Sequence, residues 1–368
     1  MQNYDLQHYI DAKKAIASSV LKYVDNDTNN EDDFQSIIQL IEKYKIQKNS
    51  EEFILFIKLI DQISQMHHYS PNTYEKLIKI LQFFKEDIIK NFSNEEIFTT
   101  FGNKRILLYL IEDNILKIDK SIAQQINKRD SNFRDYFFPE IKPFLDDPKE
   151  PKSMPPDFDE LRKNPSGKNV LFHCLQTDDL SGFISFIKNS KVSIKEDAKI
   201  APEFYEYYGY FNPEELLFTE YAIYFGSKRI LDYLVLKDFP IKQTSIEFAI
   251  RGGNLDIFKK LEKTISNPYK ETSSWMKTAI CAHENEMATY IKDKYLFISG
   301  DNLKNYIDRM VEMHNYYFMN PNFKFQCSNI FSFLAFSKSF NLSTILLRNN
   351  KINMNEEIIL DSIISNLV

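Results

Sequence analysis

The stretch DNDTNNEDD at residues 25–33 has the composition with which a calcium loop of the helix-loop-helix kind begins. Its candidate ligands are Asp25, Asp27, Asn29, Glu31 and Asp33. Such a loop needs Gly at its sixth position and a bidentate Glu at its twelfth. The chain has Asn30 and Ser36 there, so the coordination sphere would not close. We therefore predict a solvated loop between two helices and no metal site.

Histidine and cysteine pairs are the next candidates for metal or nucleophilic chemistry. His67 and His68 are adjacent and would point about 100 degrees apart on a helix, and no His or Cys follows at the spacing of a zinc site. The pairs at 173–174 and 281–283 fail the same test. Cys281 lies in no local signature of a catalytic cysteine, so we expect it to pack as a small apolar residue. We predict no catalytic residue, no metal and no cofactor.

Composition limits the classes of protein to which the chain belongs. Of its 368 residues 43% are hydrophobic and 27% charged, which is enough apolar material to offset the entropy of ordering. The net charge of −6 opposes binding to polyanions, so we expect no nucleic acid partner. Three cysteines far apart indicate reduced thiols, and neither an apolar leader nor a run of about 18 to 20 apolar residues occurs. We predict a cytoplasmic protein without membrane insertion.

Apolar residues recur at helical spacing in the first 145 residues. In 73–90 they fall three and four positions apart, and similar stripes cover 6–24, 34–46 and 51–66. Ser50 precedes Glu51 and Glu52, and we expect it to cap the helix that follows. Seven of the thirteen prolines lie between 139 and 165, which predicts an extended connector. We divide the chain into a helical N-terminal region (1–145), a proline-rich linker (146–168) and a repeat region (169–368).

A repeat runs through the chain. FGNKRILLYL at 101–110 and FGSKRILDYL at 225–234 agree at eight of ten positions. Three longer stretches share an Ala-Ile pair: YAIYFGSKRILDYL from 221, FAIRGGNLDIFKKL from 248 and TAICAHENEMATYI from 278. Fainter copies begin at 173 and 333. Periods of about 20 to 50 residues are typical of solenoids and arrays, so we expect helix pairs that each cover the apolar side of the next.

Each column of this repeat has a mechanical role. A small residue at 222, 249 and 279 allows close helix packing, and Gly226 and Gly253 supply a left-handed turn, with His283 in the same column. Ser227 and Asn254 are expected to cap the second helix. The apolar positions that should face the core are Ile230, Leu234, Ile257 and Leu261.

These residues resemble the ankyrin repeat, in which an Ala-rich first helix, a Gly turn and a second helix with paired aliphatic residues follow one another. More closely, the chain is similar to divergent ankyrin-repeat proteins of parasitic protists (trichomonad type). The pieces that carry this likeness are NKRILLYLIEDNILKID at 103–119, YFFPEIKPFLDD at 136–147, TEYAIYFGS at 219–227 and IKDKY at 291–295. The resemblance implies an all-α fold, an ankyrin-like helical-repeat solenoid with an N-terminal α-helical region. The functions of that group are largely uncharacterised.

Repeat arrays present an extended surface, so we predict a non-enzymatic scaffold or adaptor that binds a protein partner. In ankyrin repeats the variable positions are the two residues before the turn Gly. The resemblance therefore implies that the partner-binding residues are Tyr224, Phe225, Arg251 and Phe336. The alternative is that Tyr224 and Phe225 pack between repeats. The aromatic runs FYEYYGYF at 204–211 and HNYYF at 314–318 are open to the same two interpretations, binding or packing.

Two other classes of function stay open. An enzyme or effector would carry unrecognised chemistry in the helical N-terminal region, and it would need polar side chains that converge in a pocket. A helical adaptor for RNA would need a basic stripe along one face of the repeats.

Overall fold

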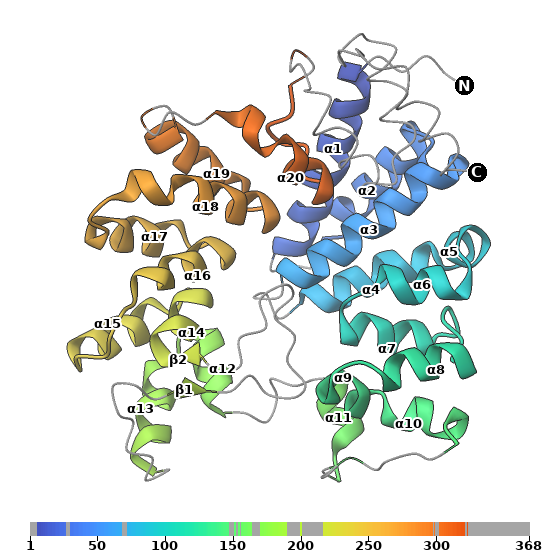
Figure 1. The fold of residues 1–368 in the computed structure, drawn as a ribbon, viewed down its shortest axis with the longest axis horizontal. Helices are drawn as coiled ribbons and strands as arrows, with labels where there is room; N and C mark the ends of the chain where they lie inside the picture. Colours follow the sequence, from blue (N-terminus) through green and yellow to red (C-terminus); the bar gives the residue numbers. More distant parts are fainter. Residues whose placement is uncertain are drawn as a thin grey trace.

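The computed structural model of the chain is mostly helical (Figure 1). It describes residues 6–26, 30–67, 72–146, 151, 154, 156–163, 170–189, 199–200, 216–296, 298, 302–320 and 322. The elements of the N-terminal half are α1 (Leu6–Asp25), α2 (Glu31–Lys43), η1 (Ile46–Lys48), α3 (Ser50–Met66), α4 (Thr73–Phe83), α5 (Lys85–Asn91), α6 (Asn94–Thr100), α7 (Lys104–Glu112), α8 (Lys120–Asn127), α9 (Ser131–Tyr136), α10 (Phe138–Ile141), η2 (Lys142–Phe144) and α11 (Phe158–Lys163).

The second half consists of short helices that follow one another in pairs. Its elements are α12 (Val170–Thr177), α13 (Leu180–Asn189), β1 (Lys199–Ile200), β2 (Leu216–Leu217), α14 (Phe218–Tyr224), α15 (Lys228–Leu236), η4 (Gln243–Ser245), α16 (Ile246–Arg251), α17 (Leu255–Leu261), η5 (Glu262–Thr264), α18 (Pro268–Cys281), α19 (Asn285–Ile291), η6 (Lys292–Leu296), η7 (Leu303–Tyr306) and α20 (Ile307–Glu312). The two strands pair antiparallel, with Lys199 opposite Leu217 and Ile200 opposite Leu216. Apart from this short ladder the described chain is helical, as the sequence predicts.

The predicted N-terminal helices are present, and polar side chains begin several of them. Asn30 accepts a hydrogen bond from the backbone N–H of Asp32 and so caps α2. Asn49 does the same for α3, because its side chain accepts from the N–H groups of Glu51 and Glu52. The prediction that Ser50 is this cap was wrong by one residue. Ser50 is already the first residue of the helix.

The buried apolar side chains of the described residues form two cores, and α1 belongs to both. Ile16 and Val20, in its second half, pack in the core of the N-terminal helices. Leu6, Tyr9 and Ile10, in its first turns, pack in the core of the second half. In Figure 1 α1 accordingly lies between α20 and α2, so the chain folds back to bring its repeat region against its first helix.

Part of the predicted linker is a helix. Helix α11 lies inside 146–168, and its Phe158 belongs to the N-terminal core. Its Arg162 is buried and donates to the carboxylate of Glu140 at 2.8 Å and to the carbonyl oxygen of Tyr136 at 3.0 Å. The run FDELRK carries no proline, so nothing in it removes a helical hydrogen bond. The prediction of an extended connector was therefore wrong for residues 158–163.

Among the described residues, seven turns share one backbone geometry. Two of them, at Asn114 (58°) and Asp238 (62°), follow α7 and α15. The other five follow α12, α14, α16, α18 and α20, and their residue with positive φ is Asp178 (51°), Gly226 (71°), Gly253 (66°), His283 (58°) or His314 (48°). The N–H of the residue that follows donates to a carbonyl oxygen five positions back, in Cys174, Ala222, Ala249, Ala279 and Met310, at 2.7 to 3.0 Å. This is the hydrogen bond that closes a helix with a left-handed residue. The three alanines are fully buried, at 0% exposure, which confirms the predicted small-residue column.

The side chains after the left-handed residues do not cap the second helices as we had predicted. No side-chain cap is made by Ser227 on α15 or by Asn254 on α17. Instead, the hydroxyl of Ser227 donates to the carbonyl of Leu175, and Nδ2 of Asn254 donates to those of Ile223 and Tyr224 at 3.2 and 3.0 Å. Each side chain therefore ties its own turn to the turn of the preceding helix pair.

The two copies of FGxKR fold differently. Gly226 has positive φ, whereas Gly102 has not. Its neighbour Asn103 is a true helix cap, because its Oδ1 accepts from the N–H of Arg105 at 3.0 Å. The next residue, Lys104, is buried with its ammonium 5.1 Å from the ring centre of Tyr136. The same short sequence therefore adopts a different turn geometry in each half of the chain.

Candidate interaction site

The predicted partner-binding residues lie along the first helices of the repeats. Tyr224 ends α14 and is only 6% exposed. Phe225 is half-buried, stacks on Tyr221 with ring centres 6.3 Å apart and meets Tyr224 edge to face at 5.1 Å. Arg251 is half-buried at the end of α16. Tyr224 belongs to the core of the second half, which fits packing, whereas the ring contacts of Phe225 lie within α14 and its C-cap and do not test packing between repeats. The partner-binding role stays a prediction.

Other candidates from the sequence lie where the structure gives no description. Phe336, the repeat copy that begins at 333 and the tyrosine-rich stretch 204–211 are all outside the described residues. The second aromatic run, 314–318, is described and divides into two roles. Tyr316 is buried and meets the ring of Tyr9 with centres 6.1 Å apart, whereas Tyr317 is 44% exposed.

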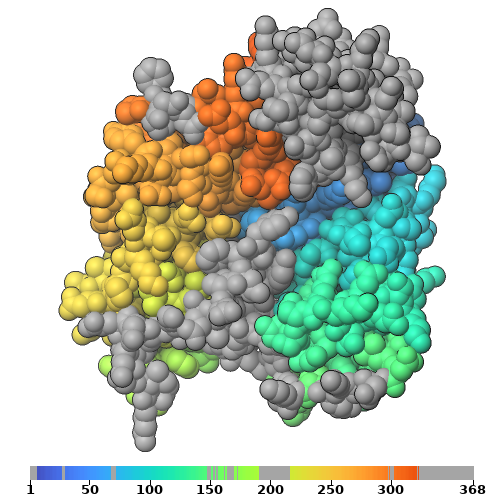
Figure 2. All heavy atoms as spheres, viewed as in Figure 1, coloured from blue at the N-terminus to red at the C-terminus, as the bar shows by residue number. Residues whose placement is uncertain are grey.

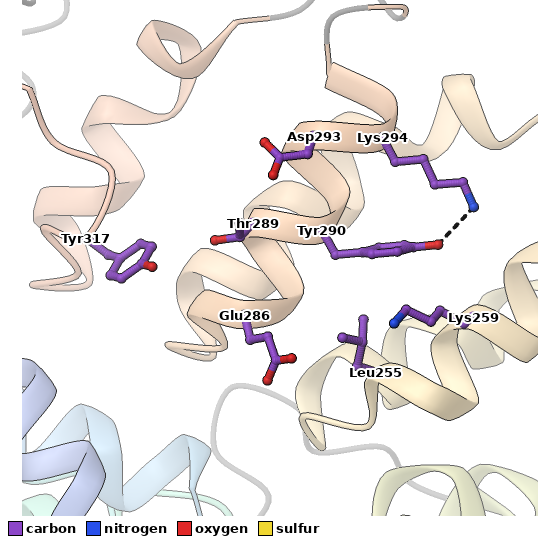
Figure 3. Close-up of a pocket in the computed structure, with 8 residues that line it drawn as sticks. All are labelled: Leu255, Lys259, Glu286, Thr289, Tyr290, Asp293, Lys294 and Tyr317. Carbon is purple, nitrogen blue, oxygen red and sulfur yellow. Dashed lines mark hydrogen bonds between the residues drawn. The ribbon is translucent and has the colours of Figure 1, made fainter.

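An open hollow lies beside Tyr317, between α17, α19 and the segment after α20 (Figure 3). Its volume is about 620 Å³. The lining residues are Leu255, Lys259, Glu286, Thr289, Tyr290, Asp293, Lys294 and Tyr317. We call this hollow the α17–α19 groove. It runs along second helices of the repeats, a face that the sequence did not single out.

Opposite charges line the two sides of this groove. Figure 3 shows the carboxylates of Glu286 and Asp293 on the Tyr317 side of the Tyr290 ring, and the ammonium groups of Lys259 and Lys294 on the α17 side. Both ammonium groups lie near the Tyr290 ring, 5.0 and 5.2 Å from its centre. Glu286 is exposed and makes no ion pair with any residue that the structure describes. A bound group would therefore meet negative charge on one side of Tyr290 and positive charge on the other.

A buried carboxylate fixes the basic side of the groove. Glu262 accepts from the hydroxyl of Tyr290 and the ammonium of Lys294, both at 2.7 Å, and from the hydroxyl of Tyr295 at 2.5 Å. Burial opposes its charge, but these donors outweigh burial and hold the pKa of Glu262 below its usual value. Burial and the nearby Glu262 carboxylate together raise the pKa of Tyr295 to about 12. The positions of Tyr290 and Lys294 are thus set before any partner binds.

The groove has the chemistry of a docking site for a charged chain. A cation on the Tyr317 side would meet an exposed aromatic ring, the carboxylate of Glu286 and the carboxylate of Asp293, which also pairs with Lys292 at 3.0 Å. Aromatic rings and carboxylates together attract Arg and Lys. A carboxylate on the other side would meet Lys259. An extended peptide that carries both charges in sequence would satisfy both sides at once.

The remaining candidates for chemistry have structural partners. Asp33 of the acidic loop accepts from the ammonium of Lys22 at 2.7 Å. Burial raises the pKa of the thiols of Cys174 and Cys281, which disfavours the reactive thiolate. No cluster of three or more His, Cys, Asp or Glu that could hold a metal ion occurs within the described ranges. No helix in those ranges is both long and apolar enough to span a membrane.

Sequence comparison adds one finding. Residues 236–348 match a family model described as a domain of unknown function (DUF3447). No curated protein and no solved structure matches the chain. The matched range contains α16 to α20 and therefore the whole α17–α19 groove.

Sequence reasoning missed this groove because its residues belong to different repeats. Leu255 and Tyr317 are far apart in the chain, and only the stacking of the helix pairs brings them to one hollow. One usable signal was present. The run HNYYF at 314–318 is rich in aromatic residues, and its Tyr317 is the exposed ring at the edge of the groove.

Proposed function

We propose that the chain is a non-enzymatic scaffold that binds a protein partner through an ankyrin-like helical-repeat solenoid. The observation that carries this proposal is the recurrence of one left-handed turn at residues 178, 226, 253, 283 and 314. Helix pairs joined by the same turn stack in the same orientation, and stacked pairs present a continuous surface to a partner. The side-chain ties from Ser227 and Asn254 to the preceding turns hold that surface in register.

The partner docks in the α17–α19 groove with an extended segment. The segment carries an Arg or Lys that lies over Tyr317 between Glu286 and Asp293, and an acidic residue that meets Lys259. Charge complementarity of this kind governs the rate and specificity of association more than its strength. The exposed Tyr317 ring supplies the aromatic anchor that interfaces favour.

The first-helix face is the second candidate surface, since Phe225 and Arg251 are half-buried and keep part of their surface exposed. Affinity capture from the native cell, followed by mass spectrometry, separates the two faces. One bait carries Lys259→Glu with Glu286→Lys, and another carries Phe225→Ala with Arg251→Ala. The matched control carries Lys48→Glu with Glu42→Lys, which reverses two exposed charges in the N-terminal half.

The expected result is that the groove bait loses proteins that the wild type and the control both recover. Loss with the first-helix bait alone would assign binding to Phe225 and Arg251. Recovery of the same proteins by all baits would contradict both surfaces, and a wild-type bait that recovers no specific protein would contradict the scaffold function itself.

A further inference from the structure

The repeat half contacts the N-terminal half across a junction formed by α1 and α3 on one side and by α18 to α20 on the other. Figure 2 shows the orange surface of the last repeats directly beside the blue surface of the N-terminal helices. Nε2 of Gln62 on α3 donates to the carbonyl oxygen of Glu312 on α20 at 2.8 Å. The rings of Tyr9 and Tyr316 meet edge to face across the same junction. Two segments more than 200 residues apart are thus in direct contact.

His67, at the end of α3, is the polar centre of this junction. Its side chain is 2% exposed. Nδ1 lies 3.1 Å from Oδ1 of Asp25 at the end of α1, and Nε2 lies 2.7 Å from the carbonyl oxygen of Ala282 in the turn between α18 and α19. Both neighbours only accept hydrogen bonds, and an imidazole donates from both nitrogens only in its protonated form. The carboxylate of Glu284, 3.9 Å from Nε2, adds a second negative charge.

We propose that His67 is a proton-controlled clasp, whose imidazolium form holds the repeat half against the N-terminal half and whose deprotonation lets the two halves separate. The neutral ring has one donor, so either Asp25 or Ala282 then loses its hydrogen bond. An unsatisfied polar group in a buried contact destabilises that contact. Apolar side chains of α1 in the core of the second half also hold the junction, so loss of such a contact shifts the closing equilibrium by the free energy of that contact.

The electrostatics of the closed junction agree with a retained proton. Burial opposes the charge of His67, but the hydrogen bond that it donates to Asp25, the charge of Glu284 and the carbonyl of Ala282 outweigh burial, and the pKa lies above the ordinary 6.5. When the junction opens, the ring returns to water and to about that ordinary value. The clasp is therefore complete below about pH 6.5 and weakens as the pH rises through the raised pKa, by up to about tenfold in the closing equilibrium per pH unit.

Two further histidines face the junction and act in the opposite sense. Burial and the charge of His67 lower the pKa of His283 to about 3. Burial, together with Lys13 on α1 and Lys58 on α3, holds the pKa of His314 far below its ordinary value. Both are therefore neutral when the junction is closed and take up protons below about pH 6.5 once it opens. The closed form should thus be most populated near that pH and open on either side.

An ammonium group also faces this site from α4. That of Lys76 donates to the carbonyl oxygens of Val24 and Asn26, on either side of Asp25. Burial raises the pKa of Asp61, also on α3, to about 7, so the His67 variants described below, and not the pH range alone, assign the response to His67.

Small-angle X-ray scattering of the full chain tests the clasp between about pH 5 and about pH 9. The expected radius of gyration is smallest near pH 6.5 and grows on both sides, with helical circular dichroism unchanged. Nuclear magnetic resonance of ring-labelled histidine should show His67 titrating above 6.5, at the midpoint of the alkaline expansion. A constant radius from about pH 6.5 to about pH 9, or an expansion accompanied by loss of helix, would overturn the proposal.

Three variants make the assignment specific. Asp25→Asn, at a side chain that is 41% exposed and so tolerant of change, should move the alkaline midpoint about one pH unit lower. His67→Gln should remove the alkaline limb and keep the acid limb. His173→Gln, an exposed histidine in α12, should behave as the wild type. An alkaline limb that persists in His67→Gln, or a midpoint unmoved in Asp25→Asn, would refute the clasp.

Discussion

Nδ2 of Asn254 lies 3.0 Å from the carbonyl oxygen of Tyr224, and this hydrogen bond joins the turn of one helix pair to the end of the first helix of the pair before it. The same nitrogen also donates to the carbonyl oxygens of Ile223 and Gly252. A side chain at position 226 would collide with the Asn254 side chain, because a Cβ on Gly226 would stand 2.2 Å from Oδ1 of Asn254. Asn254 and Gly226 are therefore coupled across the stack.

Asn254→Ala should destabilise the chain by about 1 to 2 kcal/mol, since one side chain satisfies several carbonyl groups that the substitution would leave without it. Urea denaturation followed by circular dichroism measures the loss. Lys260→Ala, on the exposed side of the same helix, is the matched control and should change stability by less than about 0.5 kcal/mol. Equal effects of the two substitutions would show that the tie adds nothing to the stack.

Gly252→Ala tests how closely successive helix pairs approach. The φ of Gly252 is −86°, which every residue tolerates, so backbone strain plays no part. A Cβ at this position would stand 1.9 Å from the carbonyl oxygen of Tyr224, and a backbone atom cannot move aside as a side chain can. We expect a loss of about 1 to 3 kcal/mol.

The control for this substitution is Gly253→Asn. Asn tolerates positive φ, and the three heavy atoms nearest to a Cβ at this position all belong to the flexible carboxylate of Glu284. It should cost less than Gly252→Ala in thermal or urea unfolding. If it costs more, left-handed geometry and not helix spacing limits the repeat.

Leu234→Ala should cost about 2 to 5 kcal/mol, because the side chain is fully buried between helix pairs and its removal leaves a cavity. Leu236 lies two residues later on the same helix and is 81% exposed. Leu236→Ala is therefore an internal control that changes the same atoms without a cavity. Its expected effect is below about 0.5 kcal/mol, and comparable losses in both variants would contradict the burial of Leu234.

The regular part of the fold could be predicted because its physical requirements are local. A buried small residue and a left-handed residue stand four positions apart in the turns that the sequence predicts, so residue types such as Ala222 and Gly226 are enough to predict the turn. The turn after α20 was not predicted, because Met310 and His314 occupy the same two positions. These two residues adopt the same backbone geometry, but their types are not typical of such a turn.

Contacts between distant segments could not be predicted in this way. The hydrogen bond from His67 to Ala282 spans 215 positions, and neither residue carries a local pattern that points to the other. The division of α1 between two cores is similar, because Tyr9 and Ile16 lie on one apolar stripe that the sequence cannot divide. The α17–α19 groove likewise exists only once the helix pairs are stacked.

The carboxyl of Asp61 predicts an unusual dependence of stability on pH. It is buried on α3, where Oδ1 accepts from the N–H of Gly102 at 2.9 Å and Oδ2 accepts from the amide of Gln65 at 2.5 Å. Burial outweighs these donors and raises its pKa from 3.8 to about 7. Because the folded value is above the unfolded one, the contribution of Asp61 is complete below about pH 3.8 and is lost as the pH rises through 7, by up to about 4 kcal/mol.

Relative to the wild type, Asp61→Asn should therefore be more stable by about 1 to 2 kcal/mol near pH 5 and by up to about 4 kcal/mol near pH 8. The amide retains an acceptor for Gly102, and the Gln65 amide can turn so that its oxygen accepts from the new donor. Urea denaturation at both pH values measures the difference. Asp32→Asn, at an exposed carboxyl on α2, serves as the control and should leave the difference between the two pH values unchanged. If Asp61→Asn responds to pH as the wild type does, the carboxyl stays ionised in the folded chain, and burial does not govern its proton.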